Sequence, residues 1–212
     1  MENNMDELAR QLRCPSGPYA REVGDNMFQS NFNMICKAID GLNITGNEQI
    51  LEIGFGNGKH LSYLLSRAPQ LSYRGVDISE AMVQEAAENN TSENTRFFLT
   101  DGSGQLDFPP ETFDACFTVN TLYFWQDVPL QLAEIRRVLK PSGRFTLAFI
   151  EQEFGRRLPF TQTGFTFYGK EELSRHLRSA GFSEIDYEDF TEEVFSKDGQ
   201  AGGRPFTGVT AL

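Results

Sequence analysis

The sequence contains few of the residues that build metal, redox and disulfide sites. Its 212 residues include only three cysteines and two histidines. The cysteines are far apart, at positions 14, 36 and 116, with no Cys-x-x-Cys spacing. An odd number of scattered cysteines indicates neither a disulfide framework nor a zinc site. We therefore expect no metal in the functional site.

Positive charge is also scarce. Lysine and arginine total 19 against 30 aspartates and glutamates, which gives a net charge of −11 and a pI near 4.7. Such a charge repels a phosphate backbone on average. The densest basic stretches, Arg136-Arg137 with Lys140 and Arg156-Arg157, are short. We therefore expect no nucleic-acid partner.

Long apolar runs are missing as well, so no segment is predicted to span a membrane. The first seven residues are polar and acidic rather than typical of a secretory signal. Hydrophobic residues make up 39% and charged residues 23%, as in ordinary globular proteins. These features predict a cytoplasmic protein without a membrane partner. The chain length predicts a single domain over residues 1–212, and we expect a monomer or homodimer.

The most informative stretch places three glycines at alternate positions. The apolar run 49–53 predicts a short buried strand, Gly54, Gly56 and Gly58 follow it, and a helical leucine pattern begins at Leu61. Strand, glycine turn and helix form the first half of a βαβ unit. Glycine has no side chain to hold a ligand away, so such a turn brings backbone N–H groups close to it.

The glycine spacing separates two classes of nucleotide-binding protein. The dinucleotide fingerprint G-x-G-x-x-G needs a glycine where this chain has Lys59. The pattern E-x-G-x-G-x-G, beginning at Glu52, instead resembles motif I of class I S-adenosylmethionine-dependent methyltransferases. Phe55 and Asn57 differ from the smaller residues common in that family, a change that backbone contacts tolerate. The alternative is a purely structural strand–helix turn.

Strands and helices then alternate along the chain. This pattern predicts an α/β, Rossmann-like, doubly wound sheet with mostly parallel strands. The further expected strands are 73–79, 96–100, 113–120 and 144–150, and the helices between them are 80–90 and 128–139.

The last part of the chain changes pattern. After a helix at 170–180, two strand-like runs, 183–194 and 204–210, flank the polar loop 196–203. They predict an antiparallel hairpin that closes a seven-stranded sheet. A dehydrogenase would repeat the βαβ pattern here, whereas class I methyltransferases have such a hairpin.

A second resemblance covers the later part of the chain. The run 134–144, E-I-R-R-V-L-K-P-S-G-R, is similar to the helix and turn before the fifth strand in ubiquinone/menaquinone-biosynthesis-like small-molecule methyltransferases. Residues 164–173 and Ala180-Gly181-Phe182 match their later portion. The resemblance implies a methyltransferase that uses S-adenosylmethionine, releases S-adenosylhomocysteine and acts on a small molecule.

Amphipathic helices are expected at 5–13 and 25–40. By their periodicity alone they would cover a sheet edge. The resemblance implies that the N-terminal part, 1–46, also folds over the cofactor and brings Tyr19, Met27 and Asn31 near it. Residues 47–150 would form the cofactor-binding half, and 151–212 a lid, a helix and the closing hairpin.

Polar residues at the predicted strand ends match parts of the cofactor. Asp77 suits the two ribose hydroxyls, although it also suits a helix N-terminus. Ile78 would lie against the adenine. Asp101 would accept from its amine and the Gly102 N–H would donate to the ring, although Asp-Gly is also a common turn.

Glu52 is expected to hold the amino group of the cofactor. Asn120 would meet the same group or merely cap its strand. The full set of expected cofactor contacts is Glu52, Gly54, Phe55, Gly56, Gly58, Asp77, Ile78, Asp101, Gly102, Asn120 and Thr121.

Methyl transfer needs a general base only if the acceptor arrives protonated. Tyr123 and His60 are the expected catalytic residues, although His60 also fits a structural role. Other candidate bases are Tyr19, Glu151 and Tyr168. Nineteen phenylalanines suggest an apolar acceptor pocket, and those expected near it are Phe28, Phe32, Phe124, Phe154, Phe160, Phe165 and Phe167.

Three functions compete at this point. They are a small-molecule methyltransferase, a catalytically silent S-adenosylmethionine-binding protein with a sensor or partner role, and a nucleotide-dependent oxidoreductase. Lys59 and the closing hairpin disfavour the third. The chain lacks an Asn-Pro-Pro-Tyr/Phe motif after the fourth strand, where Asn120-Thr121-Leu122 stands. Its absence argues against methylation of adenine or glutamine amides.

Overall fold

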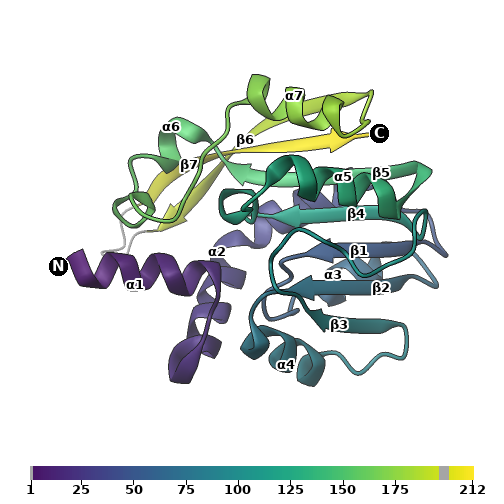
Figure 1. Ribbon diagram of the computed structural model, residues 1–212. Coiled ribbons are helices and arrows are strands. Elements are labelled where there is room, and N and C mark those ends of the chain that lie inside the picture. The colour runs from purple at the N-terminus through teal and green to yellow at the C-terminus, as the bar shows by residue number, and fades with distance from the viewer. Residues whose placement is uncertain (1, 196–200) are drawn as a thin grey trace.

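The fold is built on one mixed β-sheet, seen in a computed structural model that describes residues 2–195 and 201–212 (Figure 1). The strand order within these residues is β3-β2-β1-β4-β5-β7-β6. Neighbours from β3 to β5 pair in parallel, and β7 pairs antiparallel with both β5 and β6. The predicted doubly wound sheet and its closing hairpin are confirmed. The strands are β1 (Gln49–Ile53), β2 (Ser72–Asp77), β3 (Thr95–Leu99), β4 (Phe113–Val119), β5 (Leu139–Ile150), β6 (Ile185–Phe195) and β7 (Ala201–Ala211).

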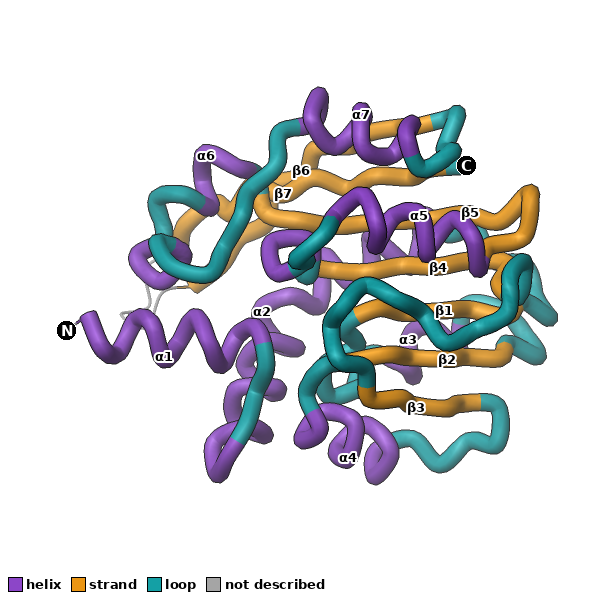
Figure 2. The backbone as a smooth tube through the Cα atoms, in the orientation of Figure 1, coloured by secondary structure: helices purple, strands orange, loops and turns teal. Residues whose placement is uncertain are grey.

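Helices cover both faces of the sheet. The α-helices are α1 (Glu2–Arg13), α2 (Ala20–Gly41), α3 (Leu61–Ser66), α4 (Glu80–Asn89), α5 (Val128–Val138), α6 (Gln152–Gly155) and α7 (Lys170–Ser179). Short 3-10 helices span Gly17–Tyr19, Leu122–Phe124 and Pro159–Thr161. Figure 2 shows α5 and α7 in front of the strands, with α3 and part of α2 behind them. Within the described ranges, no helix combines the length and the apolar character that a membrane span requires.

The starts of α4 and α5 follow from capping side chains. Ser79 accepts a hydrogen bond from the Met82 N–H at 3.2 Å at the start of α4. Asp127 does the same for the Leu130 N–H at 2.9 Å at the start of α5. Such caps satisfy backbone donors that the first helical turn leaves free. Helix α4 therefore begins directly after the end of β2, and α5 begins at the end of the loop that follows β4. Among the described residues, helices α2, α3 and α7 have no side-chain cap.

The N-terminal helices lie at the carboxyl edge of the sheet. In Figure 1 the arrowheads of β1, β2 and β4 point toward the side where α1 and α2 stand. The inward face of α2 includes buried Met34, Ile35, Ala38 and Ile39, and this helix contacts β4, β5 and β7. The expected helical cover is therefore anchored on the sheet beside the strand ends.

Several element boundaries differ from the prediction: α2, for example, begins at Ala20 rather than at 25. The starts of two strands differ for reasons of pairing. Strand β5 begins at Leu139 rather than at 144, because Phe113 pairs with Leu139 and Ala115 with Arg144 across a bulge. Residues 140–143 are thus part of the strand rather than a turn outside it. Strand β7 begins at Ala201, so 201–203 belong to the hairpin, and residues 196–200 of the predicted loop lie outside the described residues.

Gly75 in β2 is a point where the packing leaves no room for a side chain. A Cβ there would lie 2.6 Å from Phe55 Cδ1 and 2.7 Å from the Tyr73 hydroxyl oxygen. We expect Gly75→Ala to lower the free energy of unfolding by about 1–3 kcal/mol, the usual cost of overpacking. Chemical denaturation measures it.

Gly202→Ala is the matched control, since a Cβ at that strand glycine meets nothing within 4 Å. Its free energy of unfolding should change by less than about 0.5 kcal/mol. Equal effects of the two substitutions would contradict the close packing around Gly75.

Candidate cofactor and substrate site

A cavity of about 1180 Å³, including its open mouth, lies at the carboxyl edge of the sheet. It is lined by strand ends, the glycine turn, the N-terminal helices and α5. Of the expected site residues, those in the lining are Glu52, Gly54, Phe55, Gly56, His60, Asp77, Ile78, Gly102, Asn120 and Thr121. Gly58, Asp101 and Tyr123 are not among them. The structure thus brings most of the predicted residues together around one space.

The three glycines of the turn differ in what surrounds them. All have positive φ, +74° at Gly54, +59° at Gly56 and +69° at Gly58, a region that glycine adopts most easily. A Cβ at Gly54 would lie 2.3 Å from Thr121 Cγ2, and one at Gly58 would lie 2.9 Å from Ala86 Cβ. A Cβ at Gly56 would meet nothing within 4 Å. Gly54 and Gly58 therefore permit close packing, whereas Gly56 leaves open space in the cavity.

Asp77 joins the end of β2 to this turn. Its carboxylate accepts hydrogen bonds from the Gly56 N–H at 3.0 Å and the Ser79 N–H at 2.9 Å. Burial raises the pKa of Asp77 to about 6, an effect that these backbone donors oppose and that the charge of Glu52 adds to. The site therefore holds a carboxyl group that is fixed in place and that ionises closer to neutral pH than an ordinary aspartate.

Glu52 lies at the end of β1 in a buried polar cluster. The Tyr73 hydroxyl donates to its Oε2 at 2.5 Å, and His60 Nε2 lies 2.7 Å from the same oxygen. The side chains of His60 and Glu52 are 2% and 3% exposed. Burial and the neighbouring Glu52 charge raise the pKa of Tyr73 well above its usual range. Both contacts engage one carboxylate oxygen, and the residue as a whole lines the cavity.

Tyr123 lies behind Asn120 instead of in the cavity lining. It is 5% exposed, and its hydroxyl donates to Asn120 Oδ1 at 3.0 Å while it accepts from the Ile150 N–H. Burial raises its pKa above the usual range for tyrosine. Asn120 itself has a φ of +56°, which asparagine tolerates better than most residues. The hydroxyl therefore holds Asn120 in place, and the catalytic role expected of Tyr123 stays a prediction.

Asp101 points out of the site. Its side chain accepts from the Ser103 N–H at 2.9 Å, a bond that holds the pKa of the exposed carboxyl below its usual range. This is the geometry of the plain turn, which the sequence left open as an alternative. Gly102, next in the chain, does line the cavity with a φ of +74°.

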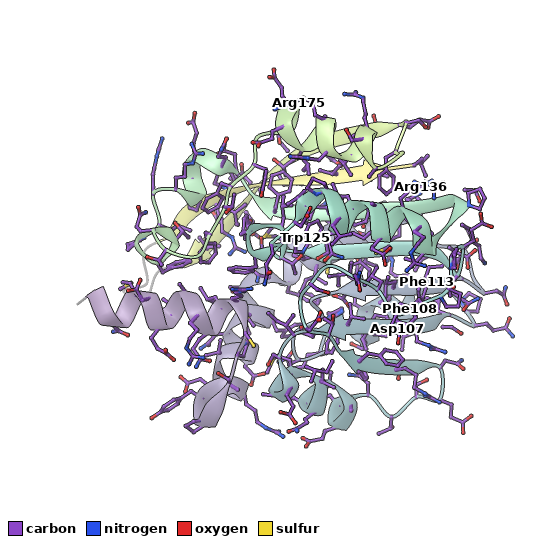
Figure 3. The ribbon with its side chains drawn as sticks, viewed as in Figure 1. Asp107, Phe108, Phe113, Trp125, Arg136 and Arg175 are labelled. Atoms are coloured by element: carbon purple, nitrogen blue, oxygen red, sulfur yellow. The ribbon has the colours of Figure 1, made fainter. Side chains whose placement is uncertain are left out.

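Helix α5 fixes the loop after β3. Glu134 accepts from the Leu106 N–H at 3.0 Å, and Arg137 donates to the Leu106 and Phe108 carbonyls at 2.8 Å each. Phe108 packs edge-on against Phe113 at 5.1 Å between ring centroids (Figure 3). This lock places Leu106, Gly104 and Gln131 in the cavity lining. None of these three residues was expected in the site from the sequence. Gln131 could have been recognised, because it is a polar residue on an otherwise apolar face of α5.

An apolar wall comes from α2 and from the segment after β4. Met27, Phe28, Asn31 and Ile35 of α2 line the cavity, spaced along one helical face. Met27 and Asn31 are thus where the sequence placed them, whereas Tyr19 is 68% exposed and outside the lining.

Aromatic side chains complete this wall. Phe124 and Trp125 join the lining, and Trp125 lies near the end of β4 (Figure 3). Phe165 supports Phe124 from behind at 4.7 Å between ring centroids. The other phenylalanines expected near the pocket, Phe32, Phe154, Phe160, Phe165 and Phe167, are not part of its lining.

Comparison with known proteins agrees with this geometry. Residues 51–147 match the family model described as a methyltransferase domain. The chain is 30% identical over 149 residues to the uncharacterized methyltransferase YdaC of Bacillus subtilis, a match that covers 70% of this chain and 78% of that protein. It spans 46%, 62% and 61% of the lengths of three further curated methyltransferases.

Two solved structures are also similar. An S-adenosylmethionine-dependent methyltransferase from Thermotoga maritima has a TM-score of 0.68 and 20% identity, with 91% of this chain and 95% of that chain covered. The [4+2]-cyclase SpnF has a TM-score of 0.64 and 27% identity, with 76% and 60% covered.

A Rossmann-like sheet with an E-x-G-x-G-x-G turn and a fixed carboxylate after β2 defines a class I methyltransferase. The chain belongs to the methyltransferase family, and its cofactor is S-adenosylmethionine. The oxidoreductase alternative has no support in these matches. The narrower resemblance to the ubiquinone/menaquinone-biosynthesis-like group stays a prediction.

The Tyr73 hydroxyl is expected to hold Glu52 in its binding orientation. Tyr73→Phe removes one donor to a buried carboxylate, so we expect about 1–2 kcal/mol less stability and severalfold weaker binding of S-adenosylhomocysteine. Denaturation and isothermal titration calorimetry measure the two effects. Tyr63→Phe is the control, because it removes an exposed bond to Asp40. It should change the binding of S-adenosylhomocysteine by less than about twofold and the free energy of unfolding by less than about 0.5 kcal/mol. Unchanged binding in Tyr73→Phe would show that this bond does not position Glu52.

Cofactor affinity is expected to depend on pH through Asp77. Hydroxyl donors favour its ionised form, and burial holds its pKa near 6 in the free protein. Affinity should therefore be fully present above pH 7 and fall by about tenfold as the pH drops to 5. Calorimetry of S-adenosylhomocysteine binding across this range tests it. Asp77→Asn should bind more weakly with a flat profile, and an unchanged slope in that variant would assign the titration to another group.

Proposed function

We propose that this methyltransferase acts on a small, largely apolar molecule. This proposal rests mainly on one observation: Phe28, Phe124 and Trp125 line the same cavity as Glu52 and Asp77. Apolar and aromatic walls with a few polar groups are typical of small-molecule sites. In the family, the bound cofactor carries a methyl group on a sulfonium, which a nucleophile displaces in line.

The residues of the chain would hold the cofactor by complementary polar groups. Asp77 suits the ribose hydroxyls because a carboxylate only accepts hydrogen bonds and is held in place by two backbone donors. Glu52 suits the cationic amino group, and the open space at Gly56 suits close approach of the backbone to the ligand. Ile78 and Gly102 line the same cavity and suit the base.

His60 and Tyr123 are better explained as positioning residues than as bases. His60 Nε2 contacts the buried Glu52 carboxylate, and the Tyr123 hydroxyl already donates and accepts. With these atoms engaged, the chain would act mainly by orienting the acceptor and excluding water. This arrangement favours an acceptor whose nucleophilic atom reaches the site already deprotonated, with a free lone pair.

The acceptor wall can be tested separately from the cofactor site. Formation of S-adenosylhomocysteine is measured with a panel of small nucleophiles ranging from apolar aromatic to highly charged. We expect turnover with apolar members and, in Phe28→Ala, a KM for the acceptor raised by roughly tenfold while the cofactor Kd changes less than twofold.

Phe98→Ala is the control, since Phe98 is 40% exposed, lies outside the cavity lining and packs against Phe108 rather than Phe28. Turnover confined to charged acceptors would contradict the apolar substrate. Cofactor binding without turnover of any panel member would favour the silent binding protein. The similar structure SpnF is named as a [4+2]-cyclase rather than as a methyltransferase.

A further inference from the structure

Gln131 is an anomaly on the inward face of α5. The neighbouring buried residues on this face are Val128, Leu132, Ile135 and Val138. Gln131 is 7% exposed, and its side-chain Nε2 is buried without a hydrogen-bond partner among the described residues. Buried amides are nearly always bonded because the loss of water is costly. An unpartnered amide on a cavity wall therefore points to a ligand that completes it.

The surroundings of Gln131 place it in one part of the cavity. A Cβ at Gly104 would lie 3.6 Å from Gln131 Oε1, so the amide sits beside the backbone of the 102–106 loop. Glu134 and Arg137, one and two turns further along α5, bind that loop through Leu106. The amide therefore lies against a loop that α5 itself holds in place.

This wall is where the base of the cofactor would lie. Asp77 marks the ribose end of the site at the tip of β2, and Gly102, Gly104 and Leu106 continue the lining from the end of β3. Asp101 is the acidic residue that the sequence suggested for the base, and it faces solvent outside this lining. Two other side chains of this lining carry both a donor and an acceptor, Thr100 and Gln105. Gln105 is exposed, and of the three side chains Gln131 is the one with a buried nitrogen that has no partner within the described ranges.

We infer that Gln131 recognises the amino-bearing edge of the adenine and makes the site selective for it over a 6-oxopurine. A carboxamide presents one acceptor and two donors, which match the amine donor and the adjacent ring-nitrogen acceptor of adenine. At the N7 edge a 6-oxopurine presents two acceptors instead, so a carboxamide can satisfy only one of them, whichever way it is turned. This inference rests on the cofactor placement proposed above.

The test compares binding of S-adenosylhomocysteine and S-inosylhomocysteine by calorimetry. The wild type should prefer the adenine compound, and Gln131→Met, which keeps the length but removes the amide, should reduce that preference by about tenfold. Most of the change should be weaker binding of the adenine compound. Gln84→Met on the exposed side of α4 is the matched control, with the preference unchanged.

The outcomes separate this inference from the cofactor site itself. Gln131→Met removes an amide with no protein partner, so its thermal midpoint should stay equal to or above that of the wild type, and lost selectivity then reports recognition. Asp77→Asn should weaken both compounds by the same factor. An unchanged preference in Gln131→Met, or equal weakening of both compounds, would overturn the role of Gln131. Failure of the wild type to bind either compound would overturn the cofactor placement as well.

Discussion

The arrangement of the site depends on one buried carboxylate. Asp77 accepts from the Gly56 and Ser79 N–H groups and thereby ties the turn after β1, the end of β2 and the start of α4 to one point. Burial raises its pKa to about 6, so the folded chain bears the cost of a desolvated acceptor. A ligand with hydroxyl donors would replace hydrogen bonds that the buried carboxylate no longer makes to water, and this favours binding.

A second layer of residues acts through the first. Tyr73 and His60 hold Glu52, Tyr123 holds Asn120, and Glu134 with Arg137 holds the loop after β3. Each of these bonds joins a residue or loop of the cavity lining to a neighbouring side chain. The cavity therefore has a polar floor beside an apolar wall from α2, and the proposal of a small acceptor rests on this combination.

The sequence predicts the sheet well because its strands are short apolar runs that end in glycine, acidic or amide residues. It also brings Glu52, Gly56 and Asp77 to the edge where the structure has the cavity, since parallel strands bring their carboxyl ends to one edge. Their contacts with the cofactor stay predictions. It does not predict that Asp101 turns outward, because that depends on the Ser103 bond. Gln131 and the early start of β5 escape prediction for the same reason, as both are set by tertiary contacts between distant segments.

The most direct measurement is calorimetric titration of the wild type and Asp77→Ala with S-adenosylmethionine, S-adenosylhomocysteine and NAD. The account predicts that the wild type binds both sulfur nucleotides and not NAD, and that Asp77→Ala loses at least about tenfold in affinity while remaining folded. Wild-type affinity in Asp77→Ala would contradict the central role of this carboxylate. Binding of NAD alone would contradict the assignment of the cavity to S-adenosylmethionine.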